Sequence, residues 1–506
     1  MKKAIKKISA AVLGAIVMAT LPLSALADAS TGDTSYTYNL DYWGDVQDSP
    51  DFYTVCKVFT SSDLGLDVNM KSPEGLFVYG DLVYVCDTGN NRIIEIKRTS
   101  AEKMEVLRII DSFKGADNNT FAGPTDIAIS EEGCFFIADK GNGRVLKLDK
   151  DLNFIQEFVK PNDNTLDKDL TFQPTKLVID TADRLYCIAT GINKGLIKYE
   201  ADGTFAGFVG ATKVTFDFMD YVWKKLATQE QRAQMVSFVP TEYDNVYMDH
   251  EGFVYACTGA VTAEDLKAGD ADAVRRINLM GNDIMVRNGD WPIYGDIHMG
   301  GTGSGYEGPS YFSDVTCFDD DIFVCLDRNR GRCFGYDDQG HMVFAFGGNG
   351  NMDGYFRRPV AIEHYDHDLM VLDPLDCAIT VFIPTEFGSL VYEAIDEFDK
   401  GHYEVSGECW EEVMRLNGNY DLAYIGIGRA YLRQERYKEA MDYFEVKWDR
   451  DNYSKAYKQY RKEWVEDHIA IIVIVILALF LVPMGIGKYK SMKQEVANAD
   501  IDWEKA

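Results

Sequence analysis

The sequence lacks the motifs that identify two large enzyme classes. No Gly-x-Ser-x-Gly elbow is present to carry the serine of a Ser-His-Asp triad. The glycine-rich run Met299–Gly308 lacks the Lys-Ser/Thr ending of a phosphate loop and does not open a helix. Neither serine hydrolysis nor nucleotide binding therefore has support in the sequence.

Positive charge is also scarce. The chain has 51 Lys and Arg against 81 Asp and Glu, a net charge of −30. Four lysines lie in the first seven residues, so without them the net charge is −34. Such an excess of acid excludes nucleic acid and anionic lipid as partners. It suits the solubility of an exported domain, with attraction of a cation or cationic polymer as the alternative.

The ten cysteines include no Cys-x-x-Cys pair. Cys86 and Cys257 occupy the same position of the repeats described next, and Cys187 and Cys325 share the position one residue earlier. Repeat-equivalent cysteines lie in different repeats and serve as small buried apolar groups. Free thiols are therefore expected, with one pair among Cys317, Cys325 and Cys333 as the alternative.

A segment with a leading Pro, two apolar strands and a closing Asp-x-Gly-Asn-x-Arg turn recurs along the chain. Its clearest copies are Ser72–Arg92 and Gly123–Arg144. The second strands of the six copies end at Asp87, Asp139, Ala189, Thr258, Asp327 and Asp373, at spacings of 46 to 69 residues. Periods of about 40–50 residues that hold several short strands are typical of propeller blades. Six copies predict a six-bladed β-propeller.

In these motifs the chain resembles the NHL-repeat β-propellers, over residues 53–385. The closing turn is complete in repeats one and two and partial at Asp327–Arg332. Its Asp and Arg are expected to brace the turn. The strand Tyr53–Phe59 precedes the first leading Pro, and rings of blades usually close by pairing such a strand into the last blade. We expect it to complete the blade that contains Val360–Pro384.

Both ends of the chain carry apolar segments. Residues 1–27 have a basic start, an apolar stretch and an Ala-x-Ala site, which predict a secretory signal peptide followed by an extension, 28–52. A transmembrane helix is expected at 468–487, because Ile469–Gly487 carries no charge and spans about 30 Å at about 1.5 Å per residue. Lysines follow this run, so the positive-inside rule places the tail 488–506 in the cytoplasm. The propeller is then extracellular on a single-pass cell-membrane protein.

Residues 386–467 follow a helical period. Two units align at a spacing of 34 residues, pairing Ala394 with Gly428, Tyr403 with Tyr437, Ser406 with Ala440 and Trp410 with Phe444. The pattern resembles tetratricopeptide repeats, which generally bind proteins. The candidate docking residues are Tyr424, Tyr431, Tyr437 and Phe444. A plain stalk is the alternative.

An insertion at 211–237 predicts short amphipathic helices over one propeller face, as a functional cap or a structural plug. Residues just after the leading Pro are expected to converge on the channel: Glu74, Asp126, Lys176, Asp244 or Asn245, Asp314 and Val360. Structurally related gluconolactonase-like propellers hold a metal with a Glu like that of Glu74-Gly75 and with Asn and Asp of other blades. The metal candidates are thus Glu74, Asp126 and Asp314, with calcium as the ion. Lys176 would set a positive charge among them, and no histidine is expected there, since His364 and His367 fall at or near the last hairpin turn.

These features favour a non-catalytic, membrane-anchored binding or scaffold protein. The propeller would bind a glycan, peptide or protein, and the helical region would dock a membrane partner, as in a transport or envelope complex. No cofactor is expected apart from the calcium candidate. The alternative is a membrane-tethered, metal-dependent hydrolase or lyase of the gluconolactonase-like type.

Overall fold

The computed structural model describes residues 36–163, 166, 169–210, 243–259, 261–262, 265–266, 271–289, 291–296 and 309–503. The predicted signal peptide, the insertion 211–237 and the glycine-rich run Met299–Gly308 lie outside the described residues. The chain divides into two compact units, Met1–Gly388 and Ser389–Ala506. Each is described by itself.

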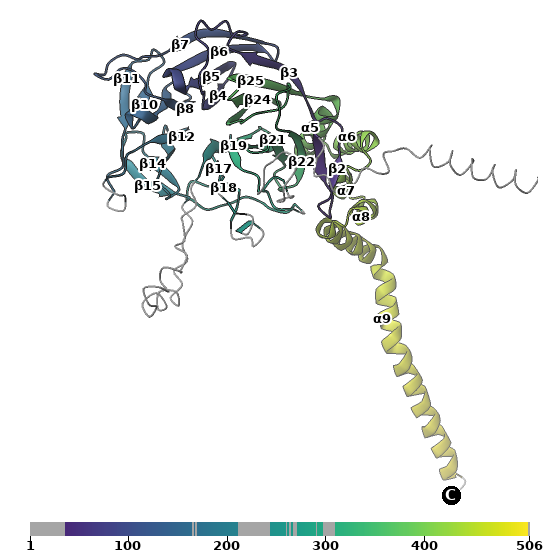
Figure 1. Ribbon diagram of the computed structural model, residues 1–506. Helices are drawn as coiled ribbons and strands as arrows, with labels where there is room; N and C mark the ends of the chain where they lie inside the picture. The colour runs from purple at the N-terminus through teal and green to yellow at the C-terminus, as the bar shows by residue number, and fades with distance from the viewer. Residues whose placement is uncertain are drawn as a thin grey trace, which may run out of the picture. The chain divides into compact units, whose positions relative to one another are not determined.

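The first unit is a six-bladed β-propeller, so the predicted fold class is confirmed (Figure 1). Blades one to three contain β4 (Gly75–Tyr79), β5 (Leu82–Asp87), β6 (Arg92–Ser100) and β7 (Lys103–Ile110); β8 (Pro124–Ile129), β9 (Phe135–Asp139), β10 (Arg144–Leu148) and β11 (Phe154–Phe158); and β12 (Pro174–Ile179), β13 (Leu185–Ala189), β14 (Leu196–Tyr199) and β15 (Phe205–Val209). Blades four to six contain β16 (Asn245–Met248), β17 (Val254–Cys257) and β18 (Val274–Ile277); β19 (Phe312–Cys317), β20 (Phe323–Asp327), β21 (Arg332–Tyr336) and β22 (Met342–Gly347); and β23 (Ala361–Tyr365), β24 (Asp368–Asp373) and β25 (Ala378–Pro384).

The first strand of each blade is the innermost one. β4, β8, β12, β16, β19 and β23 contact one another in sequence, and β23 contacts β4 to complete the ring (Figure 1). The blade faces bury apolar side chains against the neighbouring blades, as in the cluster of Val85, Ile94, Leu372 and Ile379 from blades one and six. Because each blade buries its faces only against its neighbours, closure of the ring is required for stability.

The ring closes through the strand that precedes the first repeat. β3 (Tyr53–Thr60) pairs antiparallel with β25, which confirms the expected closure. The chain before β3 adds a feature that the sequence did not predict. β1 (Thr37–Leu40) pairs with β22, and β2 (Val46–Asp48) pairs with β1, so blade five is extended to six strands.

In blades one and two the Asp-x-Gly-Asn-x-Arg turn ties the blade to the segment that leads into it. The Asp87 carboxylate accepts hydrogen bonds from Arg92 at 2.7 Å and from the Lys71 N–H at 2.7 Å. Asp139 and Arg144 are paired likewise at 3.0 Å. A Cβ on Gly89 would lie 2.5 Å from the Lys71 carbonyl oxygen, so the motif needs glycine there. The expected structural role of these residues is confirmed.

All ten thiols are free, and six of them are buried. Burial raises the pKa of Cys187 and of Cys333. The exclusion of water keeps these thiols protonated, so they act as small apolar groups in the blade interfaces.

The second unit is helical and begins within α5 (Glu386–Asp399). It continues through α6 (Tyr403–Leu416), α7 (Asp421–Arg433), α8 (Tyr437–Val446) and α9 (Arg450–Trp503). The small residues lie where helices approach closely. A Cβ on Gly428 would lie 2.5 Å from the ring of Phe444, and one on Gly426 would overlap the indole of Trp410. The absence of a side chain at these two glycines thus lets an aromatic ring of the neighbouring helix pack closely against α7.

α9 contains the predicted apolar segment. Its span Arg450–Asn498 includes a window of mean hydropathy 3.2 with none of its surface buried, which is long and apolar enough to cross a membrane. Pro483 lies inside the helix without ending it. The helix begins against α8, where Ala456 is fully buried beside Phe444.

Candidate functional site

One position of each innermost strand is equivalent in all six blades. It lies opposite the residue just before the end of the second strand, and it holds Gly75, Asp126, Lys176, Asn245, Asp314 and Ala361. In blades two, three and five a β-bulge precedes this position and re-aims its side chain. Four of the six positions are polar, and the two small residues stand in the adjacent blades one and six.

The sequence placed Glu74 and Val360 in this ring, but the register gives Gly75 and Ala361, one residue later. In blades two and three the ring residue is the second after the leading Pro, and the same count applies in blades one and six. Glu74 is not among the residues that line the cavity described next. In blade four the ring residue is Asn245, whereas Asp244 bonds the Tyr311 hydroxyl at 2.7 Å.

A cavity of about 630 Å³ occupies the channel. Its walls are the innermost strands and the turns that follow them. The strand residues Asp126, Lys176, Asn245 and Asp314 mark its inner end, where Glu363 joins them. The turns form its mouth, with Arg184 and Glu251 among the charged residues there.

Asp126 and Lys176 form a pair at the inner end. The Asp126 carboxylate lies 3.8 Å from the Lys176 ammonium and accepts a hydrogen bond of 2.8 Å from the Leu177 N–H of the next blade. Burial raises the pKa of Asp126, although Lys176 opposes the shift. Burial also disfavours the charged form of Lys176, but the fields of Asp126 and Asp314 outweigh it and raise the pKa of Lys176. The pair therefore latches blade two to blade three.

Asp314 joins three blades. It accepts hydrogen bonds from the Asn245 side chain of blade four and, at 2.8 Å, from the Ile362 N–H of blade six. Burial raises the pKa of Asp314 to about 7, against the opposing field of Lys176. A carboxyl with this pKa is only partly ionised at neutral pH.

Glu363 is the residue at the inner end that the scaffold does not use. It lies on β23 two residues after the small ring residue Ala361, is 8% exposed, and lines the cavity. Its carboxyl accepts from the N–H of the adjacent His364, and among the described residues no ion pair and no hydrogen bond to another strand joins it. Burial, and then the charges of Asp314 and Asp126, raise the pKa of Glu363 well above its usual range. The sequence analysis missed Glu363, although it stands two residues after a ring position and so points the same way along the strand.

No histidine stands at the six ring positions, as the sequence predicts, although His250 and His364 line the cavity. His364 is on β23, near the last hairpin turn, and its Nδ1 lies 2.6 Å from the Thr316 hydroxyl oxygen. Burial lowers the pKa of His364 to about 4, so the ring is neutral at pH 7. His367, in the turn as expected, lies 3.0 Å from the Asp320 carboxylate.

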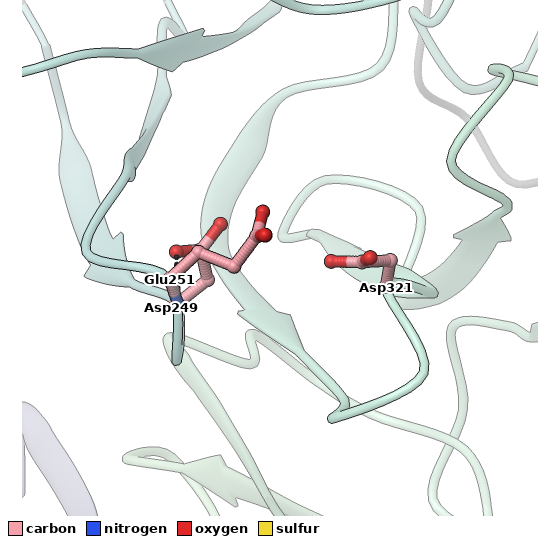
Figure 2. Close-up of side chains that lie close together, drawn as sticks. All are labelled: Asp249, Glu251 and Asp321. Carbon is pink, nitrogen blue, oxygen red and sulfur yellow. Dashed lines mark hydrogen bonds between the residues drawn. The ribbon is translucent and has the colours of Figure 1, made fainter.

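A separate group of carboxylates lies on the turns of blades four and five. Figure 2 shows Asp249 and Glu251 on one turn and Asp321 facing them from the other, and their oxygens are close enough to share an ion. The guanidinium of Arg276 already forms ion pairs with all three, at 2.6 Å from Asp249, 2.7 Å from Glu251 and 3.5 Å from Asp321. This group is therefore an ion-pair cluster whose centre is already occupied by an arginine.

The four docking candidates of the helical unit differ in exposure. Phe444 is fully buried between α7 and α8, so it supports the helices from inside. Tyr424 and Tyr431 are partly exposed and lie on either side of Tyr443, at ring distances of 6.3 and 5.6 Å. Lys447 and Arg436 stack on these two tyrosines at 4.6 and 3.8 Å. Tyr437, at the start of α8, is also partly exposed.

No protein-family model and no curated protein matches the sequence. Solved structures with a similar fold include a streptogramin B lyase, at 12% identity and TM-score 0.38 over 66% of this chain and 98% of that one. A virginiamycin B lyase from Staphylococcus aureus matches at 10% identity and TM-score 0.36, over 65% and 99%. The extracellular domain of a proposed one-component system from B. thetaiotaomicron matches at 14% and 0.33, over 63% and 37%. At these identities the likeness concerns the fold alone.

Proposed function

We propose that this protein is a non-catalytic, membrane-anchored binding protein of the cell surface. The propeller would hold a small ligand in its channel, and the helical segment would dock a partner in the membrane, such as a component of a transport or envelope complex. The observation that carries the proposal is the channel cavity. Its volume of about 630 Å³ suits a small organic ligand, and a few polar groups converge at its inner end.

Binding is favoured over catalysis because the groups at the inner end are committed to the scaffold. Asp126 and Asp314 hold backbone N–H groups of neighbouring blades, so their oxygens are not free to complete the shell of six to eight that calcium requires. His364 has a pKa of about 4, which makes it a weak general base near neutral pH. The hydrolase or lyase alternative predicts stoichiometric metal in the purified protein, lost in Asp126→Asn.

Docking by the helices is supported by their tyrosines. Tyr424, Tyr431 and Tyr437 stay partly exposed, and tyrosine gives a large contact area with a polar end, which suits protein interfaces. The resemblance to tetratricopeptide repeats leads to the same proposal.

A pull-down of the full chain from native membranes tests the proposal. The variant carries Tyr424→Ser, Tyr431→Ser and Tyr437→Ser and leaves the buried Phe444 untouched. Tyr457→Ser, an exposed tyrosine on α9, is the matched control. We expect the triple variant alone to lose its membrane partner while keeping wild-type helicity. If the triple variant captures the same partners as the wild type, the helices act only as a stalk.

A further inference from the structure

We propose that the ligand of the channel is an organic cation, an amine or guanidinium compound, whose charged group binds Glu363 at the inner end of the cavity. The inference rests on the proposed ligand-binding role of the propeller and names the chemical class of its ligand. It follows from a charge balance around the cavity, from the hydrogen bonds of each carboxylate, and from the size of the space.

The positive groups of the cavity are already matched by carboxylates. Lys176 lies 3.8 Å from Asp126, and Arg184 donates to Asp180 at 2.6 Å. Arg276, just outside the lining, balances Asp249. After this pairing, Asp314 and Glu363 remain at the inner end, and neither lies within 4 Å of a cation among the described residues. When Glu363 ionises while Asp314 keeps its proton, one positive charge completes the balance.

The two remaining carboxyls differ in what occupies them. Asp314 accepts hydrogen bonds from Asn245 and from two backbone N–H groups, Val315 and Ile362, all at 2.8 Å or less. Glu363 is bonded only to the N–H of its own neighbour His364 among the described residues, and its side chain is more than nine-tenths buried. A ligand that donates to Glu363 therefore displaces no bond between blades, and a hydrogen bond to a charged group contributes about 1.5–3 kcal/mol.

The size of the space separates an organic cation from a metal ion. A bare ion would leave most of the 630 Å³ unfilled, and only one carboxylate at the inner end has free oxygens. A primary ammonium or guanidinium needs only one or two strong acceptors, and its carbon skeleton would cover Leu177, Val246 and Tyr247 of the wall. The mouth adds the exposed carboxyls of Glu131 and Asp366, which attract cations from solution.

Binding exchanges a cation for a proton. Around Glu363 the facing groups are Asp126 on β8, Lys176 on β12, Asn245 on β16 and Asp314 on β19. Burial and like charge raise the pKa of Glu363, and burial raises that of Asp314 to about 7, so both carboxyls hold their protons to a higher pH than exposed ones do. An ammonium stabilises the carboxylate, and the displaced proton passes to solvent. Affinity therefore increases with pH, by up to about tenfold per pH unit for each proton released.

Calorimetry of the full chain in nonionic detergent tests the inference with butylamine, putrescine and agmatine, and with 1-butanol as the neutral analogue. Titration in two buffers of different ionisation enthalpy reports the proton released. We expect the amines to bind with proton release, the alcohol not to bind, and Glu363→Gln to weaken amine binding about 10- to 100-fold. Glu132→Gln, an exposed glutamate in the β8–β9 turn, is the matched control and should bind as wild type.

A second variant guards against a folding defect in Glu363→Gln. Lys176→Gln removes the positive charge at the inner end, so it should tighten amine binding. The inference is overturned if no amine binds, if Glu363→Gln in a folded state binds as wild type, or if calcium or magnesium binds at Glu363 instead. If amines fail but an uncharged sugar or peptide stabilises the propeller, the organic-cation inference fails and the binding role stands. If no class of ligand binds, both fail.

Discussion

The raised pKa of Asp314 predicts an unusual pH dependence of stability that one substitution should remove. Asp314 has a pKa of about 7 in the folded protein and 3.8 as its ordinary value. Between these limits the folded protein keeps the proton and the unfolded chain has lost it. Stability from this group is therefore fully present below pH 4 and is lost as the pH rises to 7. Over about three pH units, at about 1.4 kcal/mol per unit, the loss is about 4 kcal/mol.

Asp314→Asn removes the titration but keeps the shape of the side chain. The amide can still accept from Asn245, but one of its atoms becomes a donor facing the Ile362 N–H, which costs about 1–3 kcal/mol at every pH. The variant should therefore be less stable at pH 4 and approach or exceed the wild type near pH 7. The loss of stability that is the same at every pH and the weaker dependence of stability on pH can therefore be measured separately.

Urea unfolding of the full chain in nonionic detergent, at intervals from pH 4 to pH 8, measures both. The difference in free energy of unfolding between the two proteins is the quantity of interest, because carboxyls away from the channel titrate equally in both. The free energy of unfolding of Glu132→Gln should change with pH in the same way as that of the wild type. Parallel curves for Asp314→Asn as well would refute the claim that burial holds a proton on Asp314.

Four further predictions follow from the fold and the two candidate sites. Phe59→Ala, in the closing strand, should lower the free energy of unfolding by about 3–5 kcal/mol and should lower the melting temperature of the whole propeller as one transition. A loss of structure confined to the terminus would contradict closure by β3. Arg276→Ala should leave three facing carboxylates unbalanced, so calcium should raise the melting temperature of this variant and not of the wild type. Gly428→Val should drive a side chain into Phe444 and melt α7 and α8, seen as lost helicity by circular dichroism; an unchanged spectrum would contradict the close approach. Protease added to intact cells should digest the propeller and leave a small C-terminal membrane fragment; a protected propeller would refute the expected topology.

The sequence predicted the propeller because its signals are local and repeated. A leading Pro, alternating strands and an Asp-Arg turn are each read within about twenty residues, and six copies leave few alternatives. The closing strand was predictable for a physical reason, since an unpaired edge is costly. The strands β1 and β2 were not, because they pair across nearly the whole propeller sequence, as in Thr37 opposite Phe346.

The site was harder to predict because one residue of register decides which way a strand side chain points. Counting from the leading Pro placed Asp126 and Lys176 correctly but stopped one residue early in blades one and six, which gave Glu74 and Val360 in place of Gly75 and Ala361. The count of two residues that holds in blades two and three would have given all four positions. Glu363 was missed because only the first residues after each Pro were considered, whereas it lies two residues beyond the ring position Ala361.

The polar residues at the inner end of the channel have two roles. Some hold neighbouring blades together, and one is available to a ligand. Asp126 and Asp314 each hold a backbone N–H of the next blade, so replacing either one weakens the propeller itself. Lys176 lowers the cost of keeping those carboxylates buried. Glu363 makes no hydrogen bond to another blade within the part of the chain that the structure describes, yet its burial near two other acids disfavours its ionised form. A costly group that does not hold the blades together is typical of sites that bind. Glu363→Leu should therefore stabilise the unliganded propeller while Asp126→Leu should destabilise it, and the same sign for both would show that the two carboxyls belong to one structural network.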